Sequence, residues 1–220
     1  MIAAFDRRRF LIMLTGVFGM GVFLSFLVGA DYGTDTSTFM NTSIAARTGL
    51  SFGTTMLLTN GLLFLIPLFR GRHLIGAGTI CNMTVVGYTC DLFRYLEQRF
   101  MPADAFTSQP SRTILFATAL IPFLFFTTMY MISDQGLAPF DTPPVLLSDR
   151  FHLPFFLVRM GWDGLVILIG ILFGKRLTVG TVVFLFTIGP AVAAIGRWLR
   201  RALRLPEVIP NQKESKKTAS

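Results

Sequence analysis

Charged residues are scarce in this chain of 220 residues, and histidine and cysteine are nearly absent. Only 15% of its residues are charged, whereas soluble globular domains carry about 25%. Hydrophobic residues make up 52% of the chain, and the mean hydropathy is +0.61. So little polar surface does not suit a domain surrounded by water. We therefore expect an integral membrane protein whose main partner is the lipid bilayer.

The shortage of metal-binding side chains argues against cofactor chemistry. The chain has two histidines, His73 and His152, and two cysteines, Cys81 and Cys90, and none of them has metal-ligand spacing. On one helix Cys81 and Cys90 would be about 13.5 Å apart, which is too far for a disulfide. The sequence also lacks a phosphate-binding loop. We expect no metal, no cofactor and no enzymatic activity.

The net charge of +8 is concentrated near the ends of the chain. One basic cluster is Arg7 to Arg9, and the other begins at Arg197 and extends to Lys217. Basic clusters that flank apolar segments are typical of chains that meet anionic headgroups. Since no basic patch is interleaved with aromatic residues, we do not expect a nucleic-acid partner.

Six apolar runs approach the length of about 20 residues that a membrane crossing requires. They cover residues 10–29, 48–69, 74–90, 113–133, 154–174 and 177–196. Their length and uniform apolarity favour helices over the alternating strands of a barrel. The first run follows three arginines and resembles an export signal. It is longer than the 7–15 apolar residues typical of such signals, so we expect a retained helix.

The second half of the chain repeats the first. Residues 59–79 align with 162–181, and six of the sixteen columns from 59/162 to 74/177 are identical. An Asp-x-Gly motif at 31–33 recurs at 134–136, which is 103 positions later. Each copy would contain three crossings, so the two copies would have opposite orientations. The sequence thus predicts an all-α membrane protein with six transmembrane helices in a 3+3 inverted repeat.

The repeat also predicts the organisation of the chain. It comprises an N-terminal segment, a first copy, a connector, a second copy and a basic tail, at residues 1–9, 10–92, 93–112, 113–196 and 197–220. Six crossings would put thirteen Lys and Arg residues on the side of both termini and six on the other side. The positive-inside rule then places both termini in the cytoplasm. We expect the end of the tail, beyond residue 205, to be disordered.

Each copy also contains a polar stretch that is too hydrophilic to cross a membrane. These stretches, 31–44 and 134–147, each read as a loop followed by a short helix. Asp141 suits the N-cap of the second short helix, and residues 35–37 offer the same chemistry to the first. Each could be an interfacial turn between crossings. Alternatively, each is a half-helix that folds back toward the membrane centre and presents its N-terminus to an anion.

Asp163 is the leading candidate for a functional residue. It lies near the middle of the fifth run, where an ionisable side chain costs at least about 2.5 kcal/mol and must face protein or water. Asn60 is its counterpart in the first copy, and we expect the two to approach each other near the pseudo-two-fold axis. Arg159 lies four residues before Asp163 on the same helix face and can pair with it. The further candidates for binding a substrate or ion are Asn82, Asp141 and Asp31.

These polar residues have two interpretations. They form either a polar contact that holds the two halves together or a proton- or cation-sensitive group in a translocation path. Pairing with Arg159 would neutralise Asp163 and favour the first interpretation.

Short motifs follow one another in a characteristic order along residues 10–196. They are Asp31-x-Gly33, Thr48-Gly-Leu-Ser-Phe-Gly53, Asn60, Gly76-x-Gly-Thr-x-x-Asn82 with Gly87 and Asp91, Gly136-x-x-Pro139-x-Asp141, Arg159-Met-Gly-Trp-Asp163, Gly180-Thr181 and Gly189-Pro190. The series resembles the YczE/YyaS/YitT family of bacterial membrane proteins, especially its YczE branch. One departure is Thr34-Asp35, which stands where the family pattern has a Pro-aromatic pair. The resemblance implies a multi-pass protein of the bacterial cytoplasmic membrane, and it implies no catalytic residue.

Two functions are consistent with these features. The first is a small secondary transporter or permease for an ion or small molecule, with a site near Asn60, Arg159 and Asp163. The second is a non-transporting accessory protein that supports another membrane or export system. The duplication does not distinguish them, because a fold does not specify a function.

Overall fold

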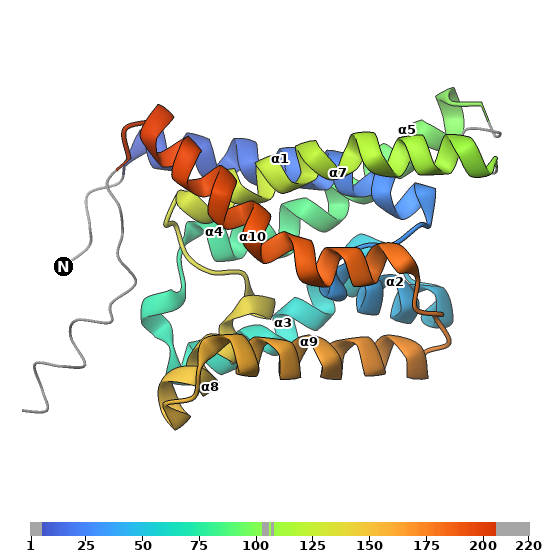
Figure 1. Ribbon diagram of the computed structural model, residues 1–220. Helices are drawn as coiled ribbons and strands as arrows, with labels where there is room; N and C mark the ends of the chain where they lie inside the picture. Colours follow the sequence, from blue (N-terminus) through green and yellow to red (C-terminus); the bar gives the residue numbers. More distant parts are fainter. Residues whose placement is uncertain (1–5, 103–105, 107, 206–220) are drawn as a thin grey trace, which may run out of the picture.

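The computed structural model of the protein describes residues 6–102, 106 and 108–205, which form helices and connecting loops with no strand among them (Figure 1). The first half contains α1 (Arg7–Ala30), α2 (Thr36–Thr48), α3 (Phe52–Arg70), the 3-10 helix η1 (Arg72–Leu74), α4 (Ala77–Cys81), the π-helix η2 (Asn82–Val86) and α5 (Gly87–Phe100). The second half contains α7 (Gln109–Ile132), the 3-10 helix η3 (Pro139–Asp141), α8 (Thr142–Phe151), α9 (Phe155–Leu172) and α10 (Val179–Ala202). The tail predicted to be disordered, beyond residue 205, lies outside the described residues.

Five helices are long and apolar enough to cross a membrane, namely α1, α3, α7, α9 and α10. The remaining expected crossing, residues 74–90, is instead divided among η1, α4, η2 and the start of α5. Helical structure is continuous from 77 to 100, but a π turn at 82–86 interrupts it and its last part is polar. Within the described residues, five helices rather than six therefore meet the length and composition criterion.

Capping residues set the helix boundaries that apolarity alone misplaces. The second crossing was expected to begin at Thr48, but Thr48 is the last residue of α2. Gly49 follows with a positive φ of 74° and ends that helix. Ser51 then accepts a hydrogen bond from the Thr54 amide and starts α3, as Ser does at many N-caps.

The core of the bundle lies around α1. Met13, Val17, Leu24 and Leu27 on this helix are fully or almost fully buried, and α1 packs along α7 and against α5. At Gly16 the two backbones approach so closely that an added Cβ would lie 2.6 Å from the Tyr130 amide nitrogen. Small residues at helix contacts are typical of membrane proteins, where close packing replaces the hydrophobic effect as the force between helices.

The two short helices lie at opposite ends of the bundle. In Figure 1, α2 and the turn between α9 and α10 are at the right, whereas α8 and the turn after α3 are at the left. Both short helices begin inside the bundle. The Thr36 hydroxyl, in the first residue of α2, donates to Asp163 halfway along α9, and Phe140, just before α8, packs against Trp162. The polar stretches are thus short helices whose N-termini face the interior.

The loop before each short helix packs against a helix start in the other half of the chain. The Gly180 amide, in α10, donates to the Tyr32 carbonyl over 3.1 Å. The Gly78 amide, in α4, donates to the Gln135 carbonyl over 2.7 Å. These contacts fix where both polar loops enter the bundle and so position the residues that follow them.

Candidate functional site

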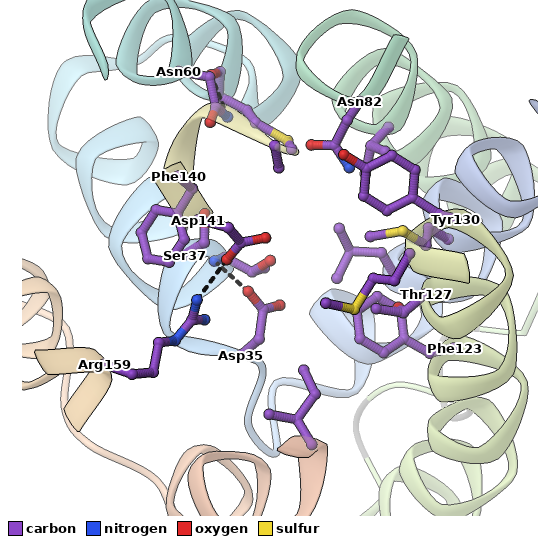
Figure 2. Close-up of a pocket in the computed structure, with 18 residues that line it drawn as sticks. Asp35, Ser37, Asn60, Asn82, Phe123, Thr127, Tyr130, Phe140, Asp141 and Arg159 are labelled. Atoms are coloured by element: carbon purple, nitrogen blue, oxygen red, sulfur yellow. Dashed lines mark hydrogen bonds and ion pairs between the residues drawn. The ribbon is translucent and has the colours of Figure 1, made fainter. Parts of the chain in front are cut away.

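A cavity of about 100 Å³ lies between the two short helices, and residues of α1, α3, η2, α7, η3, α9 and α10 also line it (Figure 2). Its principal polar lining residues are Asp35, Asn60, Asn82, Thr127, Asp141 and Arg159. A water molecule takes up about 30 Å³ of liquid volume, so the cavity has room for only a few waters. Pockets for small organic ligands usually exceed about 300 Å³. In this conformation the cavity suits an ion or a very small polar molecule.

Arg159 holds two carboxylates. Its Nη1 donates to Asp141 Oδ1 over 2.6 Å, and its Nε donates to Asp163 Oδ2 over 3.0 Å. Its guanidinium also lies over the Phe140 ring, with 5.7 Å between Cζ and the ring centroid. The spacing of four residues predicted the pairing with Asp163. The contact with Asp141 joins η3 to α9 and depends on the tertiary fold.

Asp163 lies behind the cavity wall rather than in it. Its side chain is buried, and its Oδ1 accepts a hydrogen bond of 2.7 Å from the Thr36 hydroxyl. Asp163 therefore connects α9 to the start of α2 while its other oxygen orients Arg159. Its role is to position groups that reach the cavity.

Asn60 and Asn82, two further predicted residues, line the cavity from α3 and from the first residue of η2. The Asn60 side-chain nitrogen donates to the Met56 carbonyl over 3.0 Å. Its Oδ1 is buried and has no hydrogen-bond partner among the described residues. No hydrogen bond joins Asn60 to Asp163. Asn60 thus lines the cavity and has a buried acceptor without a hydrogen-bond partner among the described residues.

Asp35 is a site residue that the sequence interpretation treated only as a cap. It precedes α2 and accepts a hydrogen bond of 3.2 Å from the Thr38 amide. It lines the cavity together with Arg159 and Asp141 (Figure 2), yet it forms no ion pair within the described part of the chain. The available signal was the dipeptide Asp-Thr, which starts both short helices, at 35–36 and at 141–142.

Thr127 was also missed. It is a buried residue of α7 whose hydroxyl has no partner among the described groups, and it lines the same cavity. Threonines in transmembrane helices commonly bond to their own backbone, so nothing in the sequence distinguishes this one.

The charges around the cavity do not balance. Three carboxylates, those of Asp35, Asp141 and Asp163, surround one guanidinium, which leaves two negative charges if all are ionised. The N-termini of α2 and α8 each contribute about half a positive charge and offset about one of the two. An uncompensated buried charge is costly. The arrangement thus favours binding of one proton or one monovalent cation.

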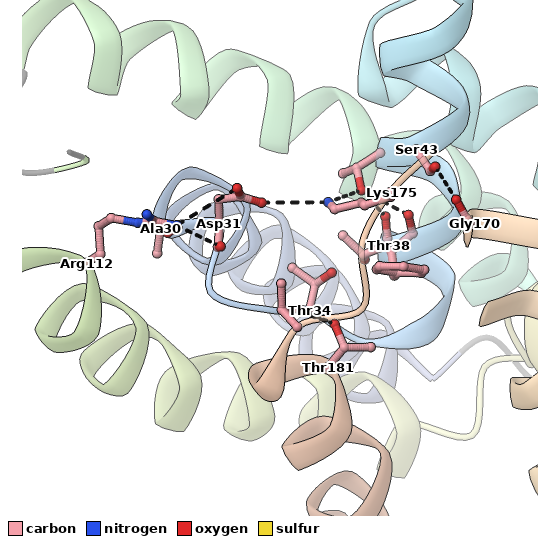
Figure 3. A network of polar contacts seen from close by, with 12 residues as sticks. Ala30, Asp31, Thr34, Thr38, Ser43, Arg112, Gly170, Lys175 and Thr181 are labelled. Carbon is pink, nitrogen blue, oxygen red and sulfur yellow. Dashed lines mark hydrogen bonds and ion pairs between the residues drawn. The ribbon is translucent and has the colours of Figure 1, made fainter. Parts of the chain in front are cut away.

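Asp31, the remaining predicted candidate, is elsewhere. It follows α1 at the end of the bundle where α2 finishes, and it contacts Arg112 and Lys175 (Figure 3). It does not line the central cavity and belongs to a separate polar cluster. In the described ranges, no group of three or more His, Cys, Asp or Glu side chains has an arrangement that could hold a metal ion.

One catalytic spacing, Gly-x-Ser-x-Gly, occurs at residues 49–53, and the sequence interpretation overlooked it. In hydrolases this motif places a serine on a sharp turn between a strand and a helix. Here Ser51 lies between two helices, where its hydroxyl accepts from the Thr54 amide and donates to the Thr54 hydroxyl. Its observed role is to cap α3.

The comparison with protein families covers nearly all of the fold. The model of a family described as "Family of unknown function (DUF6198)" matches residues 7–197, which contain all the residues that line the cavity. The chain belongs to this family. It is also 29% identical over 213 residues to an uncharacterized protein of Haemophilus influenzae, and the match covers 96% of this chain and 91% of that protein. No solved structure matches. Neither match names the YczE branch or an activity.

Proposed function

We propose that the protein is a small secondary transporter whose central cavity binds a proton or a monovalent cation. The observation that carries the proposal is Asp35, a carboxylate without an ion pair in the described chain that faces the Arg159–Asp141 pair across a small cavity. The cavity lies where the two short helices begin, as expected for transporters whose sites are formed by interrupted helices near the membrane centre. Bare carboxylates in such positions commonly mark ion pathways.

Reciprocal ion pairs support an inverted repeat as the architecture of this transporter. Arg112 donates to the Asp31 carbonyl over 2.8 Å, and its guanidinium lies 3.9 Å from the Asp31 carboxylate. Arg9 pairs with Asp134 over 3.2 Å. Arg9 and Arg112 are 103 positions apart, and so are Asp31 and Asp134. Equivalent residues exchange partners in this way when a two-fold axis relates two copies.

The backbone at these positions is also equivalent. Asp31 and Asp134 both have positive φ values, 47° and 54°, and so do Gly33 and Gly136. With the helical stretch 77–100 counted as the sixth crossing, each half has three crossings and one short helix.

The position of the chain ends supports the predicted topology. The Arg8 guanidinium donates to the Leu203 carbonyl over 2.6 Å, so α1 begins next to the end of α10, as an even number of crossings requires. With the positive-inside rule, this arrangement supports a bacterial cytoplasmic-membrane protein with both ends in the cytoplasm. The ordered motifs that resemble the YczE branch support the same location.

Binding of a proton at Asp35 would change the forces between the two short helices. In the ionised state, the carboxylates of Asp35 and Asp141 repel each other across the cavity. Protonation of Asp35 removes that repulsion and lets the starts of α2 and α8 approach. Pro67, Pro122 and Pro190 lie within α3, α7 and α10, and together with the π turn they supply sites where surrounding helices can bend.

Reconstitution into liposomes tests the proposal. Flux would be measured under gradients of protons, Na⁺ and K⁺, with candidate metabolites added on one side. We expect Asp35→Asn to abolish coupled flux, because the neutral amide cannot take up a proton or bind a cation electrostatically. Asp149→Asn is the matched control, since Asp149 is exposed on α8. Wild-type flux in Asp35→Asn would refute the assignment of Asp35.

Asp163→Asn provides a second test. The variant weakens the hold on Arg159 and removes a charged acceptor from Thr36, so we expect reduced flux. Unaltered flux would exclude Asp163 from the mechanism.

The small size of the cavity favours one alternative, a non-transporting accessory protein of another membrane system. A protein of that kind would show no flux under any of these gradients in liposomes and would co-purify with a stable membrane partner in stoichiometric amount.

A further inference from the structure

A second hollow, of about 760 Å³, lies at the end of the bundle where α1, α2 and α9 finish and α7 and α10 begin. Four basic residues line it, Arg47, Arg112, Lys175 and Arg176, together with the single acidic residue Asp31. It is separate from the central cavity, with which it shares no lining residue. Its charge has the opposite sign.

Two of the cations are fixed by the fold (Figure 3). Arg112 donates to the carbonyls of Ala30 and Asp31 over 2.7 and 2.8 Å. Lys175 Nζ donates to the Thr42 hydroxyl over 2.7 Å and lies 4.0 Å from the Asp31 carboxylate. Burial lowers the pKa of Lys175, and the negative charge of Asp31 opposes that effect. The Asp31 carboxylate, at 3.9 Å from Arg112 and 4.0 Å from Lys175, is thus the shared acidic partner of two partly buried cations.

The other two cations have no partner among the described residues. Arg47 and Arg176 are exposed and form no hydrogen bond or ion pair within the described part of the chain. Arginine presents a planar fork of donors that matches the oxygens of a phosphate group. Two such forks on the rim of one hollow leave several donors directed at whatever occupies it.

Helix ends explain only a small part of this positive charge. Basic residues often compensate helix C-termini, each of which carries about half a negative charge, while N-termini carry the opposite. Four helices, α1, α2, α5 and α9, end at this end of the bundle, and three, α3, α7 and α10, begin there. The helix ends therefore contribute about half a negative charge in total. The four cations and Asp31 sum to three positive charges. More than two positive charges therefore stay uncompensated. A phosphate monoester carries about 1.5–2 negative charges near neutral pH, and the diester of a phospholipid about one, so either group would offset part of this excess.

We propose that this hollow binds a phosphate-bearing anion, with Arg47 and Arg176 as its direct ligands and Arg112 and Lys175 as its base. The phosphate group belongs either to the headgroup of an anionic phospholipid or to a soluble phosphate compound. Basic pockets between the ends of membrane helices are suited to anionic headgroups, and the volume of the hollow is in the range of small-ligand pockets.

The sequence offers an independent reason to expect a ligand here. Under the topology proposed above, Lys175 and Arg176 lie on the side of the membrane that the positive-inside rule keeps poor in basic residues. A bound anion would account for a basic turn in that position. The binding proposal itself does not depend on transport.

The test uses the full-length protein in mild detergent. One arm titrates inorganic phosphate by calorimetry, with chloride at equal ionic strength as reference. The other arm detects retained phosphatidylglycerol by native mass spectrometry, with phosphatidylcholine as reference. We expect saturable binding in at least one arm, weakened about ten-fold or more in the double variant Arg47→Gln/Arg176→Gln, because hydrogen bonds between charged groups are strong. Binding of phosphatidylglycerol alone would identify a lipid headgroup, and binding of inorganic phosphate would identify a soluble ligand.

Two further variants make the result specific. Arg70→Gln/Arg150→Gln removes the same charge from exposed arginines at the opposite end, both of which lie in the last turn of a helix. It should bind like the wild type. Arg47→Lys/Arg176→Lys keeps the charge but loses the forked geometry, so its affinity should be intermediate. Absence of saturable binding to either probe, or an equal loss in the Arg70/Arg150 control, would overturn the proposal.

Discussion

Gly33 and Gly136 are the positions where a single methyl group should do the most damage. Both have positive φ values, 147° and 107°, and both lie in the polar loops that contact the opposite half. A Cβ at Gly33 would overlap the backbone of Gly180, and a Cβ at Gly136 would overlap the backbone of Gly76. Backbone, unlike the end of a flexible side chain, cannot move aside locally. Substitution by alanine must therefore displace a loop or a helix start.

The expected cost follows from three contributions. A non-glycine residue in such a conformation costs about 1–3 kcal/mol, and overpacking costs about 1–3 kcal/mol. Loss of one backbone hydrogen bond between a loop and a helix start, such as that from Gly180 to Tyr32, adds about 0.5–1.5 kcal/mol. We expect each of Gly33→Ala and Gly136→Ala to lower the free energy of unfolding by about 3–6 kcal/mol, the middle of the range that these contributions span.

Substitutions at two other glycines distinguish the conformational cost of a positive φ from the steric cost of an added Cβ. Gly49 has a φ of 74° but nothing within 4 Å of an added Cβ, so Gly49→Ala should incur only the conformational penalty of about 1–2 kcal/mol. Gly164 lies within α9 and also has open space around its Cβ. Gly164→Ala should be neutral or stabilising by up to about 1 kcal/mol, because alanine favours helix.

Thermal unfolding of the purified variants in one detergent, followed by tryptophan fluorescence, measures the order. We expect Gly33→Ala and Gly136→Ala to be the least stable, followed by Gly49→Ala, the wild type and Gly164→Ala. A Gly33→Ala protein as stable as Gly49→Ala would refute the close approach to Gly180. Severe destabilisation in only one of Gly33→Ala and Gly136→Ala would contradict equivalent packing of the two halves.

Three other predictions concern charge and topology. Arg159→Met should lower stability at neutral pH by about 3–5 kcal/mol, because it leaves buried carboxylates unpaired; adding Asp141→Asn should recover part of the loss in the same melts, and no recovery would contradict the pairing. Burial lowers the pKa of Lys175 from 10.5, its value in the unfolded chain. Burying the charged ammonium therefore lowers the free energy of unfolding by a full penalty at pH values below the folded-state pKa. This penalty disappears as the pH rises toward the pKa of the unfolded chain. The wild type should therefore gain stability relative to Lys175→Met as the pH rises toward 10.5. Thermal unfolding of both proteins measures this, and a stability difference that does not change with pH would argue against a buried ammonium. Reporter tags in the turns at Arg72 and Lys175 should lie on opposite sides of the membrane, and a common side would rule out the inverted repeat.

Most of the helices could be predicted from the sequence, because a lipid environment requires long apolar segments with internally satisfied backbones. The exception is the crossing expected at residues 74–90. The apolar run ends at Cys90, but α5 continues to Phe100 through polar residues. Glu97 is buried there, where it accepts from the Ser25 hydroxyl and pairs with Arg94. The length of an apolar run contains no information about such a contact, which joins residues far apart in the chain.

The candidate site was predictable only where it depends on local spacing. Arg159 and Asp163 lie four residues apart on one helix, so their pairing followed from helix geometry. Asp141 reaches Arg159 from a different element, and Asp35 faces them because the loop after α1 turns back into the bundle. The glycine at 33 and its packing against α10 produce that turn. The sequence shows the glycine, but it does not specify which part of the fold packs against it.

The two copies of the proposed repeat have identical residues at several positions near their ends, but different residues at the centre. Arg9, Asp31 and Gly33 at the ends have identical counterparts 103 positions later, whereas Met56 and Asn60 near the centre correspond to Arg159 and Asp163. The end residues contact the opposite copy, so a change in one copy would break a contact that the other copy needs. At the centre, a second Arg–Asp couple would bring two more buried charges into the same small cavity, at a cost of several kcal/mol. One charged couple beside a neutral Asn60 avoids that cost and leaves Asp35 without a counterion. Asymmetry at the centre is therefore a condition for a site that takes up a single positive charge.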